Sequence, residues 1–150
     1  IPEAEIDKNK DLIIGIDGQK MSKSYNNTIP IFGKESQIKD QIMNIKTDSA
    51  GLNDLKDTNT PLFQIFSMFL RDNELKTLNE RYNTPGLKYM EVKKELFEKV
   101  MDYFSNQRKN RDKFINNPDD VRDLMKLGAE KARDIASKTL LKVKKAAGLI

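Results

Sequence analysis

The side chains that could do chemistry gather in one short segment, Lys20-Met21-Ser22-Lys23-Ser24. Two ammonium groups three residues apart, interleaved with hydroxyls on a loop beside Gly18, can converge on a polyphosphate. Held in place before a reaction, they would stabilise the negative charge that develops on a departing pyrophosphate. The segment is not a Walker phosphate loop, because that loop needs Gly directly before its Lys and here Gln19 intervenes.

The composition excludes several other kinds of site. The 150 residues contain no His and no Cys. Catalysis by a Ser/His or Cys/His pair, thiolate metal sites and disulfides are therefore excluded, and the lack of Cys fits a reducing cytosol. The 37% hydrophobic and 33% charged residues suit a helical protein with a modest core. No apolar run approaches the roughly 20 residues that cross a bilayer, so no membrane association is expected.

Apolar spacing and start signals predict a mainly helical chain that positions this loop. Thr60-Pro61 is an N-cap followed by Pro at the first helical position. Asn117-Pro118 opens the last helix in the same way, with two Asp residues following at the positive end of its dipole. A short apolar run over 11–16 is a possible strand, too isolated to build a sheet. The predicted helices span 34–46, 62–70, 72–82, 88–115 and 118–148.

The string from Asp17 to Asn27, DGQKMSKSYNN, resembles the KMSKS loop of class I aminoacyl-tRNA synthetases and matches all five letters of KMSKS. Its flanks are similar to the bacterial, tryptophan-specific branch of that family, and the resemblance covers essentially the whole chain. The tyrosine-specific branch is similar in the loop but less so in the tail. The flanking strings are Pro2-Glu3-Ala4, Thr47-Asp48-Ser49, Gly128-Ala129-Glu130-Lys131-Ala132-Arg133 and Ala146-Ala147-Gly148-Leu149.

The resemblance implies a role for each residue of the loop. Lys20 and Lys23 would bind the ATP phosphates and stabilise pyrophosphate as tryptophanyl-adenylate forms. Met21, through its backbone, would contact the adenine, and Ser22 and Ser24 would support the phosphates. Mg²⁺ would accompany ATP, with no metal ligand expected from this chain. The implied enzyme is a cytoplasmic homodimer that acts on ATP, tryptophan and tRNA(Trp), with no role for DNA.

The other motif of the family, HIGH, has no counterpart because the chain contains no His. The tryptophan pocket and most of the parallel sheet are therefore expected upstream, and the isolated chain is expected to be inactive. The resemblance implies that residues 1–46 are a remnant of an α/β nucleotide-binding domain. Residues 47–60 would be a linker, and residues 61–150 a helical bundle that binds the tRNA anticodon.

Positive charge is concentrated in the last third of the chain. Residues 1–100 carry 15 Lys and Arg against 16 Asp and Glu, whereas residues 101–150 carry 12 against 7. A polyanion would dock on this end, and the candidate tRNA contacts are Arg108, Arg111, Lys142 and Lys145. A stand-alone helical RNA-binding module without catalysis is one alternative, and a purely structural bundle with solvated lysines is another. Neither alternative explains the KMSKS loop in its flanking context.

Overall fold

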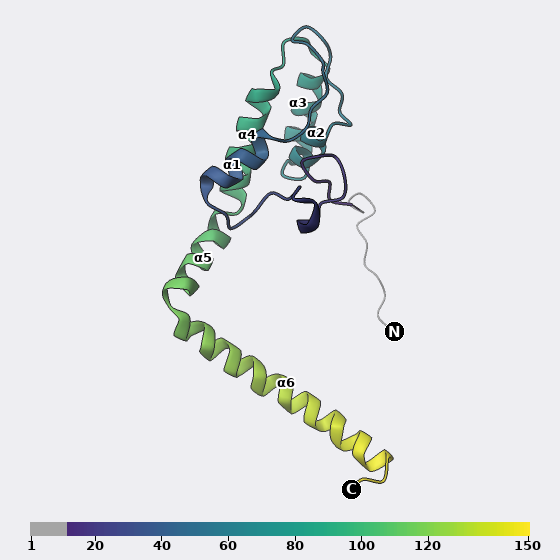
Figure 1. The fold of residues 1–150 in the computed structure, drawn as a ribbon, viewed down its shortest axis with the longest axis vertical. Coiled ribbons are helices and arrows are strands. Elements are labelled where there is room, and N and C mark those ends of the chain that lie inside the picture. Colours follow the sequence, from purple (N-terminus) through teal and green to yellow (C-terminus); the bar gives the residue numbers. More distant parts are fainter. Residues whose placement is uncertain (1–11) are drawn as a thin grey trace. The chain divides into compact units, whose positions relative to one another are not determined.

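The computed structural model describes residues 12–150, which form two compact units that divide between Asn106 and Gln107 (Figure 1). The Pro2-Glu3-Ala4 string and the first residue of the expected strand lie outside the described residues. Within 12–150 the only β pairing is a single antiparallel bridge between Ile14 and Lys20, so the prediction of a mainly α chain is confirmed. The helices are η1 (Lys23–Tyr25), α1 (Glu35–Met43), α2 (Pro61–Ser67), α3 (Asp72–Tyr82), α4 (Tyr89–Tyr103), α5 (Ser105–Asn116) and α6 (Pro118–Ala146).

The core of the first unit lies among α1, α2, α3 and α4, with α1 against α4 (Figure 1). Ile38 and Ile42 are one helical turn apart and both fully buried. Each such side chain contributes about 1.5–3 kcal/mol through burial. The core therefore runs across the predicted linker and includes α1. Its buried members are Ile38, Ile42, Ile45, Leu62, Ile65, Phe66, Leu78, Tyr82, Leu87, Val92, Leu96 and Val100.

The predicted start of α2 is confirmed. The Thr60 hydroxyl accepts a hydrogen bond from the N–H of Phe63 at 3.5 Å, and Pro61 occupies the first helical position. The same hydroxyl donates to the carbonyl of Asp57 at 3.0 Å. Because Pro has no N–H to satisfy and its φ is already helical, the chain enters the helix at this residue. The helix ends at Ser67, three residues before the predicted end.

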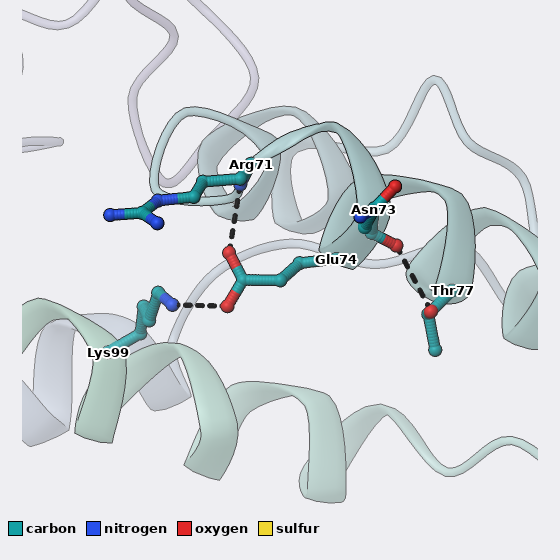
Figure 2. Close-up of polar contacts among 5 residues, drawn as sticks. All are labelled: Arg71, Asn73, Glu74, Thr77 and Lys99. Carbon is teal, nitrogen blue, oxygen red and sulfur yellow. Dashed lines mark hydrogen bonds and ion pairs between the residues drawn. The ribbon is translucent and has the colours of Figure 1, made fainter.

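One carboxylate both caps α3 and joins it to α4 (Figure 2). Glu74 accepts from the N–H of Arg71 at 2.9 Å and from the Lys99 ammonium at 2.6 Å. A second ion pair, Arg81 with Glu95, is bidentate at 2.7 and 2.8 Å. Two parallel N–H···O bonds fix the geometry of the Arg81–Glu95 pair, so α3 and α4 are linked by one bidentate and one single ion pair.

The segment between α1 and α2 is irregular, as predicted, but it is anchored to the core. The Tyr89 hydroxyl donates to Asp48 at 2.6 Å, across 41 residues of sequence. Lys56 is only 5% exposed, and its ammonium donates to the carbonyls of Ala50 and Gly51. It also lies 5.3 Å from the centroid of the Tyr89 ring. The ammonium thus organises the backbone of the loop, which compensates for its removal from water.

The prediction of one helix over 88–115 is wrong. The helix is interrupted at Phe104, the C-cap residue of α4, which has φ −97° and ψ 10°. A second helix, α5, begins at Ser105. The Phe104 ring packs on the core and stands edge-on to Phe69 at 6.0 Å. No aliphatic or aromatic residue follows until Phe114, so the apolar stripe that α4 buries has no continuation in α5.

The last helix is continuous from Pro118 to Ala146, and Gly128 does not interrupt it. Its end is closed by a glycine: Gly148 adopts φ +67°, its N–H donates to Lys145 O, and the N–H of Leu149 donates to Lys144 O at 2.9 Å. This is the Schellman arrangement. Neither α5 nor α6 contains a buried residue. Of the helices in residues 12–150, none is long and apolar enough to span a membrane.

Candidate phosphate-binding loop

A tight turn brings the start of the KMSKS segment back beside Ile14. The N–H of Gly15 donates to Gln19 O at 2.7 Å, and the N–H of Met21 donates to Ile13 O at 2.8 Å. Gly18 lies at the turn with φ +86°, a conformation that other residues adopt only with strain. The backbone of the candidate site is therefore paired on both sides of Lys20.

The second half of the segment forms the 3-10 helix η1. The Ser22 hydroxyl caps it by accepting from the N–H of Ser24 at 3.3 Å. Asn26 ends it in the left-handed region, with φ 53°, and its N–H donates to Lys23 O at 3.2 Å. The Ser22 hydroxyl keeps its own O–H free to donate, because capping uses only its acceptor capacity. The structure thus brings the five predicted residues of KMSKS into one closed loop.

The two lysines of this loop are exposed. Neither Lys20 nor Lys23 has a hydrogen bond or an ion pair from its ammonium to any residue in 12–150. Their charges are therefore not neutralised by carboxylates in this part of the chain. Two such cations on a hydrogen-bonded backbone take no part in an ion-pair network within residues 12–150 and stay accessible to a polyanion.

The side chain at the centre of the loop is Asn27, to which the sequence alone assigned no role. It is only 1% exposed. Its amide N–H groups donate to the carboxylate of Asp17 at 2.8 Å and to Lys20 O at 3.0 Å. Its amide oxygen accepts from the N–H of Ser22 at 2.7 Å. The string DGQKMSKSYNN contains both ends of this network, but its letters do not show which polar residue folds inward.

Asp17 is the charged member of this network. Hydrogen bonds from the N–H of Gln19, at 3.0 Å, and from the Asn27 amide hold the pKa of the Asp17 carboxyl below its ordinary value of 3.8. The carboxyl is thus ionised at neutral pH. Asp17 is engaged inside the loop and is not positioned as a metal ligand by itself. No group of three or more Asp or Glu side chains in the described residues is arranged to hold a metal ion.

The loop is joined to the helical core at a second point. The N–H of Lys46, just after α1, donates to Ile16 O at 2.8 Å, and the N–H of Ile16 donates to Asn27 O at 3.0 Å. Ile45, the residue before Lys46, is buried in the core at 2% exposure. The loop backbone therefore takes its position from the same helices that form the core.

The candidate tRNA contacts lie in the second unit. Arg108 and Arg111 are on α5, where Arg111 lies 3.9 Å from the carboxylate of Asp112. Lys142 is on the last part of α6 and Lys145 is in its final turn, and both are exposed. Residues 107–150 carry 12 Lys and Arg against 6 Asp and Glu, so this unit alone is strongly basic.

Comparisons with known proteins agree on one family. Residues 3–105 match the model for tRNA synthetases class I (W and Y). A tryptophan–tRNA ligase of Rhodopirellula baltica is 41% identical over 136 residues, which are 90% of this chain and 42% of that protein. A tryptophan–tRNA ligase of Campylobacter jejuni is 39% identical, over 99% of this chain and 47% of its own length.

A solved structure is similar over almost the whole chain. The crystal structure of the Campylobacter jejuni tryptophanyl-tRNA synthetase complexed with ADP and tryptophan superposes with a TM-score of 0.89 at 38% identity. The match covers 98% of this chain and 46% of that one. The chain thus spans somewhat less than half the length of the relatives it matches. On the family model and these relatives together, the chain belongs to the class I tRNA synthetases for tryptophan and tyrosine.

Proposed function

We propose that this chain is the C-terminal portion of a tryptophan–tRNA ligase and supplies its ATP-phosphate loop and its helical domain. The observation that carries the proposal is the pair of exposed lysines, unpaired within residues 12–150, on a closed KMSKS loop in a chain whose relatives are tryptophan–tRNA ligases. The Campylobacter synthetase was crystallised as a complex with ADP and tryptophan, which supports ATP and tryptophan as substrates here.

In this mechanism Lys20 and Lys23 contact the phosphates of ATP. As the tryptophan carboxylate attacks the α-phosphorus, the bond to the β-phosphate oxygen breaks and negative charge moves onto pyrophosphate. The lysine ammonium groups stabilise that charge more strongly in the transition state than in bound ATP, which lowers the barrier. Ser22 and Ser24 add hydroxyl donors. Mg²⁺ arrives on the ATP phosphates as part of the substrate.

The chain alone is proposed to be inactive. It contains no His, so it lacks the HIGH motif of the family. The tryptophan pocket and the sheet would be supplied by the other half of the enzyme. Purified residues 1–150 should therefore give no tryptophan-dependent exchange of pyrophosphate into ATP, whereas the full-length protein that contains them should give it.

The test of the phosphate role is Lys23→Ala in the full-length protein. We expect kcat for adenylate formation to fall about 10²–10³-fold, the usual loss for one electrostatic contact to developing charge. The KM for ATP should rise much less, because the lysine contributes mainly in the transition state. Lys34→Ala is the matched control: that side chain is also exposed and lies just after the loop. If Lys23→Ala changed only KM, the transition-state role would be wrong.

We also propose that the basic second unit, residues 107–150, contacts tRNA phosphates. The six-charge surplus of this unit supports that role, since Lys and Arg gain affinity by releasing counterions from the nucleic acid. The candidate contacts remain Arg108, Arg111, Lys142 and Lys145. A homodimeric enzyme in the cytoplasm is part of the same proposal and rests on the family alone.

A further inference from the structure

The amide of Asn27 is fully committed inside the candidate loop. Both of its N–H groups have acceptors, Asp17 at 2.8 Å and Lys20 O at 3.0 Å, and its oxygen has a donor, the N–H of Ser22 at 2.7 Å. The orientation of the amide is fixed by these partners. A flipped amide would place its oxygen against a carboxylate and a carbonyl, and its N–H₂ against another N–H.

These contacts bracket the peptide groups that carry the candidate chemistry. Lys20 O and the N–H of Ser22 lie on either side of Met21, so one side chain holds both of its neighbouring peptide units. No contact within residues 12–150 holds the lysine ammonium groups themselves. The direction in which the Lys20 side chain leaves the backbone is therefore set by the hydrogen bonds of the loop backbone, among them the one from Asn27, and not by partners of the ammonium.

The Asn27 amide packs against Gly15, where no side chain occupies the space. A Cβ placed on Gly15 would lie 2.4 Å from both Cγ and Nδ2 of Asn27, closer than any real contact. Gly15 is thus the residue that lets the amide reach Lys20 O and the N–H of Ser22. The burial of Asn27 removes it from competing water, so its three hydrogen bonds form a rigid network and not a solvated loop contact.

We propose that Asn27 is a positioning residue for adenylate formation, which pre-organises Lys20 and Ser22 for the phosphates of ATP. This inference rests on the proposed function. Asp17 acts as the anchor of Asn27 and keeps its amide pointing into the loop. Because pre-organised donors need no rearrangement during the reaction, losing the amide should lower kcat more than it weakens ATP binding.

Three variants of the full-length enzyme separate the contacts. Asn27→Ala removes all of them. Asn27→Asp keeps the shape and the acceptor for Ser22, but loses both donors and sets a carboxylate against Asp17. Asn27→Asp with Asp17→Asn restores a donor–acceptor pair between positions 17 and 27 but leaves Lys20 O without its donor. Asn53→Ala is the control, because that side chain is exposed in the loop before α2 and makes no hydrogen bond within residues 12–150.

In pyrophosphate exchange, Asn27→Ala and Asn27→Asp should lower kcat by about 10- to 100-fold, the size expected for a misplaced reacting group. The KM for ATP should change by less than about 3-fold on the same reasoning, and the double variant should recover part of kcat. The decisive measurement repeats Asn27→Ala in a Lys20→Ala background. If Asn27 acts through Lys20, its loss should then cost much less than in the wild type. Equal losses in both backgrounds, or a kcat within about 2-fold of the wild type, would overturn the proposal.

Hydrogen exchange separates this idea from the proposed function. The N–H of Ser22 should exchange faster in Asn27→Ala than in the wild type or in Asn53→Ala, whatever the enzyme catalyses. If the wild type showed no tryptophan-dependent exchange of pyrophosphate into ATP, the proposed function would be refuted, and with it the positioning role of Asn27 in adenylate formation. Normal wild-type activity with an unchanged Ser22 exchange rate in Asn27→Ala would refute the positioning role alone.

Discussion

The hydrogen bond from Tyr89 to Asp48 links the loop before α2 to the core, and it should contribute measurably to the free energy of unfolding. Tyr89→Phe removes one O–H donor and leaves the ring on which Lys56 lies. At 2.6 Å the bond has the length of an O–H···O⁻ contact. Hydrogen bonds to charged groups contribute about 1.5–3 kcal/mol, but the Asp48 carboxylate is exposed and water replaces part of the loss. We therefore expect the free energy of unfolding to fall by about 1 kcal/mol.

Asp48→Ala should destabilise more than Tyr89→Phe. Besides the tyrosine, the carboxylate accepts from the N–H of Ala50 at 2.9 Å and from that of Asp57 at 3.3 Å. A loss of about 2 kcal/mol is expected for the three contacts after allowance for exposure. The double variant should lose less than the sum of the two single variants, with a coupling of about 1 kcal/mol. Tyr103→Phe is the control, since that residue is exposed and its hydroxyl has no bond within the described residues.

The pH dependence of this contact has a definite sign. Burial acts to raise the pKa of Asp48, but the hydrogen bonds from Tyr89, Ala50 and Asp57 outweigh it and leave the pKa below 3.8. A lowered pKa means that the stabilisation is fully present above pH 3.8 and is lost as the pH falls through the folded-state pKa. Burial and the bond to Asp48 raise the pKa of the Tyr89 hydroxyl, so it stays protonated across the neutral range.

The assay is urea unfolding of the 150-residue chain, followed through the methyl NMR signals of buried residues such as Leu96, which report the first unit only. The difference in the free energy of unfolding between the wild type and Tyr89→Phe should be the same at pH 7 and pH 5. It should become smaller well below pH 3.8. A coupling energy between Tyr89→Phe and Asp48→Ala under about 0.3 kcal/mol, within the error of additivity, would refute a stabilising contact between the two side chains. So would a penalty for Tyr89→Phe that stays unchanged after Asp48 is protonated.

Two further outcomes are expected. Thr60→Ala should lower the free energy of unfolding of the first unit by about 1 kcal/mol, measured in urea, because it removes the N-cap of α2; Thr60→Ser should restore most of it. Binding of tRNA to the full-length protein should weaken steeply as salt rises, and the charge reversals Lys142→Glu with Lys145→Glu and Arg108→Glu with Arg111→Glu should each reduce the salt slope in filter binding. Binding that ignores salt and both pairs would mark these charges as ordinary solvated faces.

The helix starts were predictable because the signals are local. Thr60 followed by Pro61 predicts an N-cap and a first helical residue without information from the rest of the fold, and α2 begins at Pro61. Gly148 states a helix end in the same way. The break between α4 and α5 was missed for the opposite reason. Phe104 packs against the distant ring of Phe69, and no Gly or Pro marks the break in the sequence.

The candidate loop divides along the same line between local and non-local signals. Its phosphate-binding role is predicted from the resemblance of the whole DGQKMSKSYNN string to the KMSKS loop, because a loop of lysines and serines on its own is more often solvated surface. Its internal support could not be predicted, as two adjacent asparagines show. Asn26 is exposed and ends η1 with φ 53°, whereas Asn27 is 1% exposed and joins three parts of the loop. Nothing in the pair of letters distinguishes the two residues. The two residues differ only in the folded loop. There Asn27 lies beside Asp17, ten residues earlier, and fills the space that the missing side chain of Gly15 leaves.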